Sequence, residues 1–243
     1  MKRFLVISAA VIVVAAIAGG SIAAAGGTAG VVDATETQEA MNVSTLLADP
    51  AYDTEVAIYG QVSLLGELFC PCFELRSGGE VVMVWYDLMV EDGGEVRPAV
   101  SVEGIENGDW IVVTGELRSE GVDPGEFWAT SVEEAVSVDA DDDGGEVTLA
   151  IGDLLVVNLD SNPTTGYGWS LAVDGEVDVL AVAGNEFIAP EALDPPLVGQ
   201  GGVEVWAFQA VAEGEGTISM EYVRSWEQGV EPADTFSLNI VVN

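Results

Sequence analysis

In the segment Thr217-Ile-Ser-Met-Glu-Tyr-Val223, polar and apolar side chains alternate from Thr217 to Tyr222. Successive side chains of a β-strand point to opposite faces, so Ile218, Met220 and Tyr222 would share one face of a core. Five further strand candidates lie nearby, at 146–151, 154–159, 169–173, 203–211 and 235–242. About seven short strands in roughly 100 residues are typical of an Ig-like β-sandwich, which we predict for residues 146–243. The Cys-Trp-Cys core of antibody domains is missing from it.

Residues 43–138 also have the composition of strands. β-Branched and aromatic residues gather at 55–64, 81–86, 109–117 and 127–132, separated by turn-forming residues such as Asn107-Gly108. No segment shows helical periodicity, so we predict an all-β chain with a small β-barrel at 43–138. The stretches 56–62 and 108–115 resemble strands of OB-type barrels. Those folds usually bind oligonucleotides in cationic, aromatic grooves, but the barrel has only three cations, so we assign it no function: Arg76, Arg97 and Arg118.

The stretches outside these two domains are expected to be a leader and linkers. Residues 1–30 begin with Lys2 and Arg3, continue with an apolar run at 4–20 and reach alanines at 23–25, the pattern of a signal peptide. If it is retained, the segment 4–25 is long enough to span a bilayer as an anchor. Both alternatives place the protein outside the cytoplasmic membrane, secreted or held at its outer face. Residues 31–42 and the acidic run 139–145, which lacks the spacing of a calcium loop, are the expected linkers.

The charge of the chain narrows the classes of function. Its 243 residues include 42 Asp and Glu, six Lys and Arg and no His, which gives a net charge of −36. Such a field repels nucleic acids and anionic lipid surfaces, so we expect neither as a partner. Without His, a His-based catalytic triad cannot form and two Cys cannot complete a zinc site, so we expect no cofactor, no metal and no enzyme activity. The even spread of acids fits either a halophilic source, such as an archaeon, or an ordinary acidic secreted protein.

The two cysteines, Cys70 and Cys72, are separated by Pro71. One intervening residue is a poor spacing for a bridge, because the Cα and Cβ positions rarely suit it. We therefore favour two buried thiols on a strand. A local disulfide and a link to another chain stay open, since an extracellular setting permits both.

Three loops of the second domain are candidates for binding. The first lies between the strands at 154–159 and 169–173, the second precedes the strand at 203–211, and the third ends the strand at 217–223. Proline restricts φ and glycine tolerates positive φ, so we expect the first loop to be stiff. No charged residue lies in 161–172 or 195–203, as a desolvated interface core requires. The candidate residues are Asn162, Pro163, Thr164, Thr165, Gly166 and Tyr167 in the first loop, Gly199, Gly201 and Gly202 in the second, and Arg224 and Trp226 in the third.

In this order, the three loops resemble the motifs of the chagasin family of cysteine protease inhibitors, NPTTG-(Y/F), G-x-G-G and R-P-(W/F). The first motif matches at all six positions and the second at all its glycines; in the third, Ser225 replaces the proline. The resemblance covers about 100 of the 243 residues. It implies an Ig-like sandwich that presents the loops at one end, as a wedge that plugs the cleft of papain-like proteases reversibly and is not consumed.

The resemblance also implies a role for each loop. Thr164 and Thr165 would lie over the protease's catalytic cysteine, and residues 199–202 would run along the substrate channel on one side. Trp226 would contact the aromatic wall on the other side, and Arg224 would brace the loop or pair with an acid. The expected partner is thus a papain-like cysteine protease, bound by a monomer.

Each loop also has a simpler interpretation. Asn-Pro-Thr-Thr-Gly is a plausible tight turn, Gly-Gln-Gly-Gly a hairpin and Trp226 a core residue. It is the order of the three motifs, and their place at strand ends, that favours inhibition. The alternative from another class is a non-enzymatic adhesion or cell-envelope protein made of two β-domains.

Overall fold

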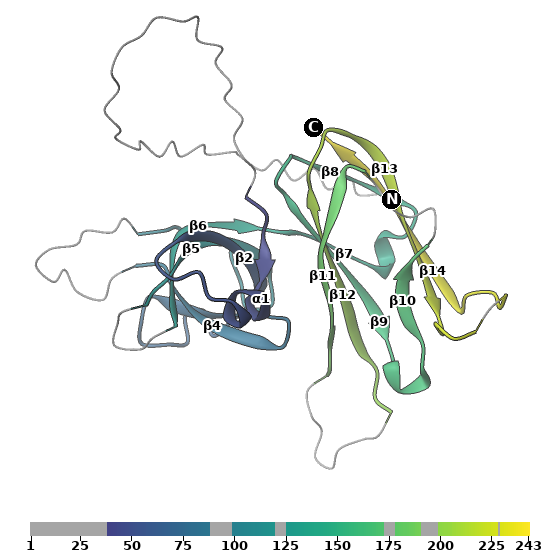
Figure 1. Ribbon diagram of the computed structural model, residues 1–243, viewed down its shortest axis with the longest axis horizontal. Coiled ribbons are helices and arrows are strands. Elements are labelled where there is room, and N and C mark those ends of the chain that lie inside the picture. Colours follow the sequence, from purple (N-terminus) through teal and green to yellow (C-terminus); the bar gives the residue numbers. More distant parts are fainter. Residues whose placement is uncertain (1–37, 88–98, 120–124, 173–177, 191–198, 228) are drawn as a thin grey trace, which may run out of the picture. The chain divides into compact units, whose positions relative to one another are not determined.

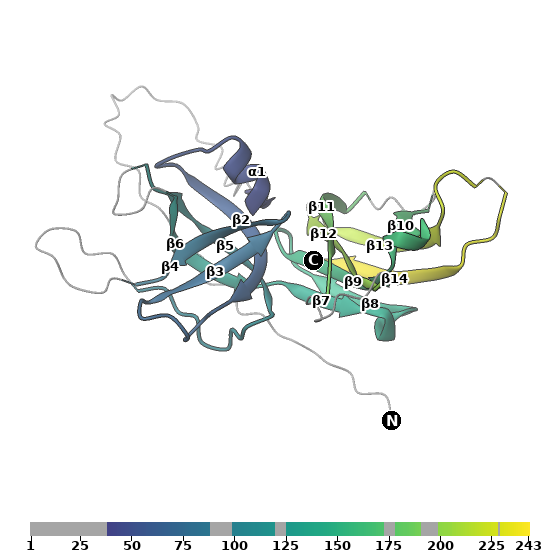
Figure 2. The same cartoon turned by 90° about the horizontal axis from the view of Figure 1, so that it is seen from below.

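The computed structural model describes residues 38–87, 99–119, 125–172, 178–190, 199–227 and 229–243. The expected leader at 1–30, and the first part of the linker at 31–42, lie outside these ranges. None of the helices in the described ranges has the length and apolar character needed to span a bilayer. Three sheets account for the described strands and build a barrel followed by a sandwich (Figures 1 and 2), so the predicted all-β class is confirmed.

The barrel is formed by five strands that close on themselves. Their order is β2-β3-β4-β6-β5, and β5 pairs back with β2. Only the β4–β6 pair is parallel within this ring. The small barrel predicted for this region is therefore present, whereas its likeness to OB-type barrels stays a prediction. The elements are β1 (Met41–Asn42), α1 (Val43–Ala48), β2 (Glu55–Ser63), β3 (Cys72–Ser77), β4 (Glu80–Trp85), β5 (Trp110–Leu117) and β6 (Glu126–Glu134).

A short helix, α1, packs against the barrel, although no helix was predicted. Asn42 is its N-cap, and the Oδ1 atom accepts a hydrogen bond from the Thr45 N–H at 2.8 Å. Val43 and Leu46 are fully buried in the barrel core. Six residues make fewer than two turns, so their apolar side chains repeat too few times to reveal a helical period. The helix is therefore a local addition to an all-β fold.

The sandwich consists of two four-stranded sheets, β10-β13-β14-β8 and β11-β12-β9-β7. Side chains from both sheets fill the space between them, among them Leu155, Phe208, Ile218 and Leu238. Ile218 and Met220 are buried, as the alternation of their strand predicted. The elements are β7 (Val136–Asp139), η1 (Ala140–Asp142), β8 (Gly145–Leu149), β9 (Leu154–Ser161), η2 (Pro163–Thr165), β10 (Gly168–Leu171), β11 (Leu180–Ile188), β12 (Gly202–Ala210), β13 (Gly214–Val223) and β14 (Asp234–Val242).

The sandwich begins before residue 146. β7 pairs in parallel with β9, and Val138 lies in the core between the sheets. Asp139 then caps the short 3₁₀ turn η1, and β8 starts at Gly145. The sandwich thus includes residues that the sequence analysis assigned to the barrel domain and to the acidic linker. Similarly, β1 of the barrel uses the last residues of the expected linker at 31–42.

The barrel and the sandwich share an apolar cluster, within the compact unit that extends from Glu36 to Asn243. The hydroxyl of Tyr59 donates to the carbonyl oxygen of Ala183 at 3.3 Å, and burial raises the pKa of Tyr59 to about 12. The sandwich side chains in this cluster lie on the outer face of β9 and β12, so the barrel covers that face. The cluster comprises Ala40, Ala57, Tyr59, Trp110, Ala135, Leu154, Val156, Val205 and Ala207.

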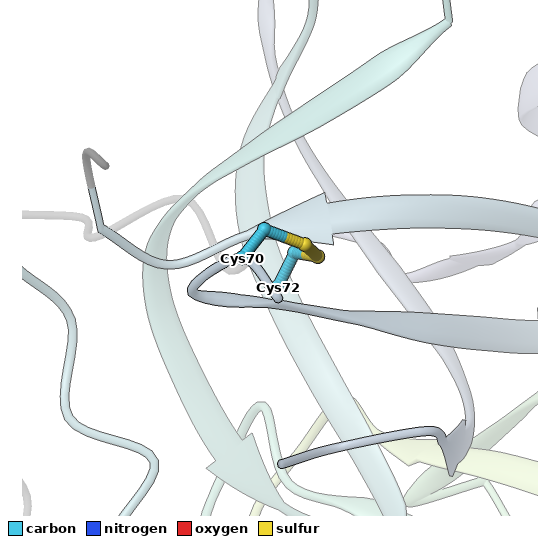
Figure 3. The surroundings of a disulfide bond; sticks show 2 residues. All are labelled: Cys70 and Cys72. Carbon is cyan, nitrogen blue, oxygen red and sulfur yellow. A yellow bond between two sulfur atoms is a disulfide. The ribbon is translucent and has the colours of Figure 1, made fainter. Parts of the chain in front are cut away.

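Cys70 and Cys72 form a disulfide, shown in Figure 3. Cys72 is the first residue of β3 and is completely buried. The favoured interpretation of two free thiols is therefore wrong, and the local bridge, one of the two alternatives, is what the structure contains. Phe69, immediately before the bridge, is fully exposed.

Candidate functional site

The three candidate loops lie at one end of the sandwich. Strand pairing shows this directly, because Ser161, at the end of β9, pairs with Gly202 at the start of β12. In the other sheet, Gly168 at the start of β10 pairs with Val223 at the end of β13. Residues 162–167 connect these two sheets, so the first loop lies between the second and the third.

The first loop is a tight 3₁₀ turn, η2. The Thr165 N–H donates to the Asn162 carbonyl oxygen at 3.0 Å, and the Gly166 N–H donates to that of Pro163 at 2.9 Å. Pro163 occupies the start of the turn, where its missing N–H costs nothing. Gly166 ends it in the left-handed region, with φ of 82°, which other residues adopt with strain. Thr164 and Thr165 are exposed at the tip.

Asn162 ties the first loop to the rest of the site. Its Nδ2 atom donates to the Gly199 carbonyl oxygen at 2.9 Å, which joins the first loop to the second. Its backbone N–H donates to the Tyr222 hydroxyl at 2.8 Å, and its Oδ1 accepts from the Thr164 hydroxyl at 2.6 Å. The side chain of Asn162 thus braces the loops, and the hydroxyls of Thr164 and Thr165 both donate to this residue.

The second loop brings its glycines against neighbouring backbone. A Cβ atom placed on Gly202 would lie 2.3 Å from the Ile188 carbonyl oxygen, and one on Gly201 would lie 3.1 Å from that of Ser161. The first distance leaves no room for a side chain. Packing therefore requires Gly202, independently of any partner.

The third loop is a turn that packs on the first. The Glu227 N–H donates to the Arg224 carbonyl oxygen at 3.0 Å, which closes the turn. The indole of Trp226 lies on Gly166, where an added Cβ would come within 2.3 Å of its ring. Trp226 is nevertheless 66% exposed, so it is not a core residue and its other surface is free to contact a partner.

Arg224 braces the first loop and also pairs with an acid. Its Nε donates to the Thr165 carbonyl oxygen at 3.2 Å, and its Nη1 lies 3.1 Å from Oε1 of Glu227. The guanidinium also covers the ring of Tyr167, with Cζ 4.4 Å from the centroid. Within this chain, Arg224 therefore does both things that the sequence left open: it braces the first loop and it pairs with an acid.

Tyr222 supports the loops from below, a role that the sequence analysis missed. Its ring lies 5.3 Å from that of Tyr167 and 5.2 Å from that of Trp169, centroid to centroid, while its hydroxyl bonds to Asn162. The sequence placed Tyr222 only in the apolar stripe of its strand. The signal in the sequence was a side chain with a hydroxyl group only two residues before Arg224, close enough to the loops to form a hydrogen bond with them.

A shallow hollow of about 520 Å³ lies between the first two loops and β13, lined in part by Asn162, Gly201 and Tyr222. Its lining also includes the carboxylates of Asp160 and Asp234. The charges of Arg224 and Glu227 offset each other. This end of the sandwich thus combines exposed threonines and one exposed indole with two acids that line the hollow.

Comparison with known proteins finds a family whose model matches most of the sandwich. Residues 148–240 match the family described as Chagasin family peptidase inhibitor I42. Chagasin from Trypanosoma cruzi is 27% identical over 103 residues, which span 41% of this chain and 91% of chagasin. Amoebiasin-2 from Entamoeba histolytica is 26% identical over 101 residues, which span 42% of this chain and 80% of that protein.

Among solved structures, the crystal structure of the cysteine protease inhibitor EhICP2 from Entamoeba histolytica aligns with 45% of this chain and 96% of its own length. The sequence identity in that alignment is 23% and the TM-score is 0.41. The family match at 148–240 includes all three loops and the strands β9 to β13. The resemblance found in the loop motifs is confirmed, because residues 148–240 match the model of the chagasin family of peptidase inhibitors.

Proposed function

We propose that the loop end of the sandwich inhibits papain-like cysteine proteases by filling their active-site cleft, reversibly and without being cleaved. One observation carries this proposal. Three loops, spread over residues 162–226 of the sequence, meet at one end of the fold and are tied together by Asn162 and Arg224. They do so within the region that matches a family of peptidase inhibitors.

In this proposal, each loop contacts a different part of the protease cleft. Thr164 and Thr165 enter the cleft above the catalytic cysteine, since only small side chains let the backbone approach that closely. Gly199, Gly201 and Gly202 follow the substrate channel, and the exposed side of Trp226 lies against the opposite wall. Bonds that already hold the loops in place reduce the entropy lost on binding.

The chain acts in this proposal as a binding protein, and not as an enzyme. Its sequence contains no His, so a His-based triad cannot form. The resistance of the first loop to cleavage follows from η2, because a protease requires an extended substrate and Pro163–Thr165 is a closed turn. The leader pattern adds the proposal that the target is met outside the cytoplasmic membrane.

Titration of papain with the full chain tests this function. Activity should fall to zero near a one-to-one ratio, and the chain should be recovered intact. Thr165→Arg should abolish inhibition by overfilling the slot, whereas Thr148→Arg, at an exposed threonine on β8, should not. The absence of inhibition at high micromolar concentration, or rapid cleavage between Thr164 and Thr165, would overturn the proposal.

A further inference from the structure

Glu204 is a carboxylate placed where the sandwich core should be apolar. It lies in β12, where Phe208 and Ala210 of the same alternation point into the core. Its exposed fraction is 8%. Removing an ionised carboxylate from water is costly unless hydrogen bonds replace the lost solvation, so its contacts require a specific explanation.

Three neutral donors surround this carboxylate. Its Oε2 atom accepts from the Ser161 hydroxyl at 3.0 Å and from the Trp169 backbone N–H at 3.1 Å. Its Oε1 atom accepts from Nε1 of Trp206 at 3.2 Å, which fixes the plane of the group. Hydrogen bonds to an ionised acceptor are stronger than those between neutral groups.

The two donors on Oε2 lie on either side of the first loop. Ser161 immediately precedes Asn162, and Trp169 follows Tyr167 by two residues. One oxygen atom therefore joins both ends of the segment 162–167. Ser161 and Trp169 belong to different sheets of the sandwich, so the same atom also sets the separation of the strands from which the loop rises.

We propose that Glu204 is a positioning residue that holds the first loop in its binding geometry. This inference rests on the proposed function, because it names the group that pre-organises the same site. The residue does not touch the partner. It acts through Ser161 and Trp169, and it lies two residues after Gly202, so the strand that carries the second loop also fixes the first.

Glu204→Gln separates this role from simple packing. The amide has nearly the same size but only one acceptor oxygen, and its NH₂ group would face a donor. The matched control is Ile218→Val, a buried change in the same core at a position in the middle of β13, where Ile218 pairs with Leu238 of β14. Ser161→Ala is a third variant, which keeps the carboxylate and removes its tie to one end of the loop.

The measurements, on the full chain, are amide hydrogen exchange over residues 161–169 without protease, inhibition of papain, and melting temperature. We expect Glu204→Gln to speed exchange in that segment and to weaken inhibition about tenfold, the change that corresponds to one charge-assisted hydrogen bond. Ser161→Ala should give a smaller change of the same kind. Ile218→Val should lower the melting temperature and leave both other quantities unchanged.

The inference would be overturned if Glu204→Gln had the same exchange rates at 161–169 and the same inhibition constant as the parent chain. It would also be overturned if Ile218→Val changed these two quantities as much as Glu204→Gln does. If Glu204→Gln does not fold, Ser161→Ala decides, and parental exchange over 161–169 in that variant overturns it. Failure of the parent chain to inhibit papain would instead reject the proposed function. The exchange measurement would still test the positioning role in that case.

Discussion

Trp226 contacts its neighbours with one face and leaves the other to solvent. The covered face rests on Gly166, where no side chain fits, so the first and third loops meet before a partner binds. A large aromatic group held in this way loses little conformational freedom when it is buried in an interface. Such residues often dominate the binding energy.

Truncation of Trp226 to Ala should therefore weaken inhibition of papain by about 2 kcal/mol or more, roughly 30-fold. The melting temperature should change little, because most of the side chain is exposed. Phe69→Ala is the matched control, since Phe69 is also an exposed aromatic but belongs to the barrel. Equal inhibition constants for the two variants would contradict the assignment of Trp226 as an anchor.

The turn at 224–227 explains how this chain departs from the family motif. The Glu227 N–H bonds to the Arg224 carbonyl oxygen, so Ser225 occupies the second position of a four-residue turn. Proline is favoured at that position in the common turn types. The turn thus forms without the family's proline, with Arg224 held in addition by Glu227 and Thr165.

Ser225→Pro should tighten inhibition by about 0.4–1 kcal/mol, because it restricts the free chain in a conformation that the turn already adopts. The inhibition constant should fall two- to fivefold and the melting temperature should rise slightly. Both are measured beside the parent protein. Weaker binding together with a lower melting temperature would show that the backbone at Ser225 does not accept proline.

The strands that could be predicted are those with a clear pattern. β13 alternates from Thr217 to Tyr222, and the predicted run at 217–223 lies inside it. By contrast, β11 was missed, because a register shift between Val182 and Gly184 breaks its pattern. β7 was missed since it has only four residues and gains its stability by pairing with β9. Long-range pairing of this kind leaves little local signal.

The candidate site was found by its motifs, but its internal bonds were not. The sequence identified Asn162, Thr165 and Arg224 without showing that they bond to the other loops. Glu204 and Tyr222 were not recognised, because a buried acid and an aromatic strand residue acquire their roles only when distant strands meet. Local patterns report which residues lie together along the chain, and bonds between loops depend on the complete fold.

The position of β7 predicts where the sandwich can be cut. A chain starting at residue 136 should be more stable than one starting at 146, by about 1.5–3 kcal/mol, because only the longer chain buries Val138. Both fragments lose the barrel from the outer face of β9 and β12, so their difference reports residues 136–145, which comprise β7, η1 and the bonds of Asp143 to Ser237. Urea unfolding measures it, and equal free energies of unfolding would show that this segment adds nothing.

At the scale of the whole molecule, the acids far exceed the cations that could balance them. The described ranges contain three arginines, and each pairs with one acid: Arg76 with Glu74, Arg118 with Asp53, and Arg224 with Glu227. The net charge of the whole sequence is −36, so carboxylates are in large excess. Their repulsion weakens the compact state wherever salt does not screen it.

The melting temperature of the full chain should therefore rise between 10 mM and 1 M sodium chloride. Screening over distances of about 3 Å at 1 M removes most of the repulsion between surface charges. An uncharged solute at the same osmolality is the control, since it does not screen charge. A melting temperature that is indifferent to salt would count against adaptation to a saline environment and leave the proposed inhibition unaffected.

The proposed inhibition depends most on which residues of the chain contact the protease. The most direct test is amide hydrogen exchange of the full chain with and without papain. We predict slower exchange at 162–167, 199–202 and 224–226 when papain is present, and no change in the barrel strands β2 to β6. Protection confined to the barrel, or no protection at the three loops while papain is inhibited, would contradict the central claim.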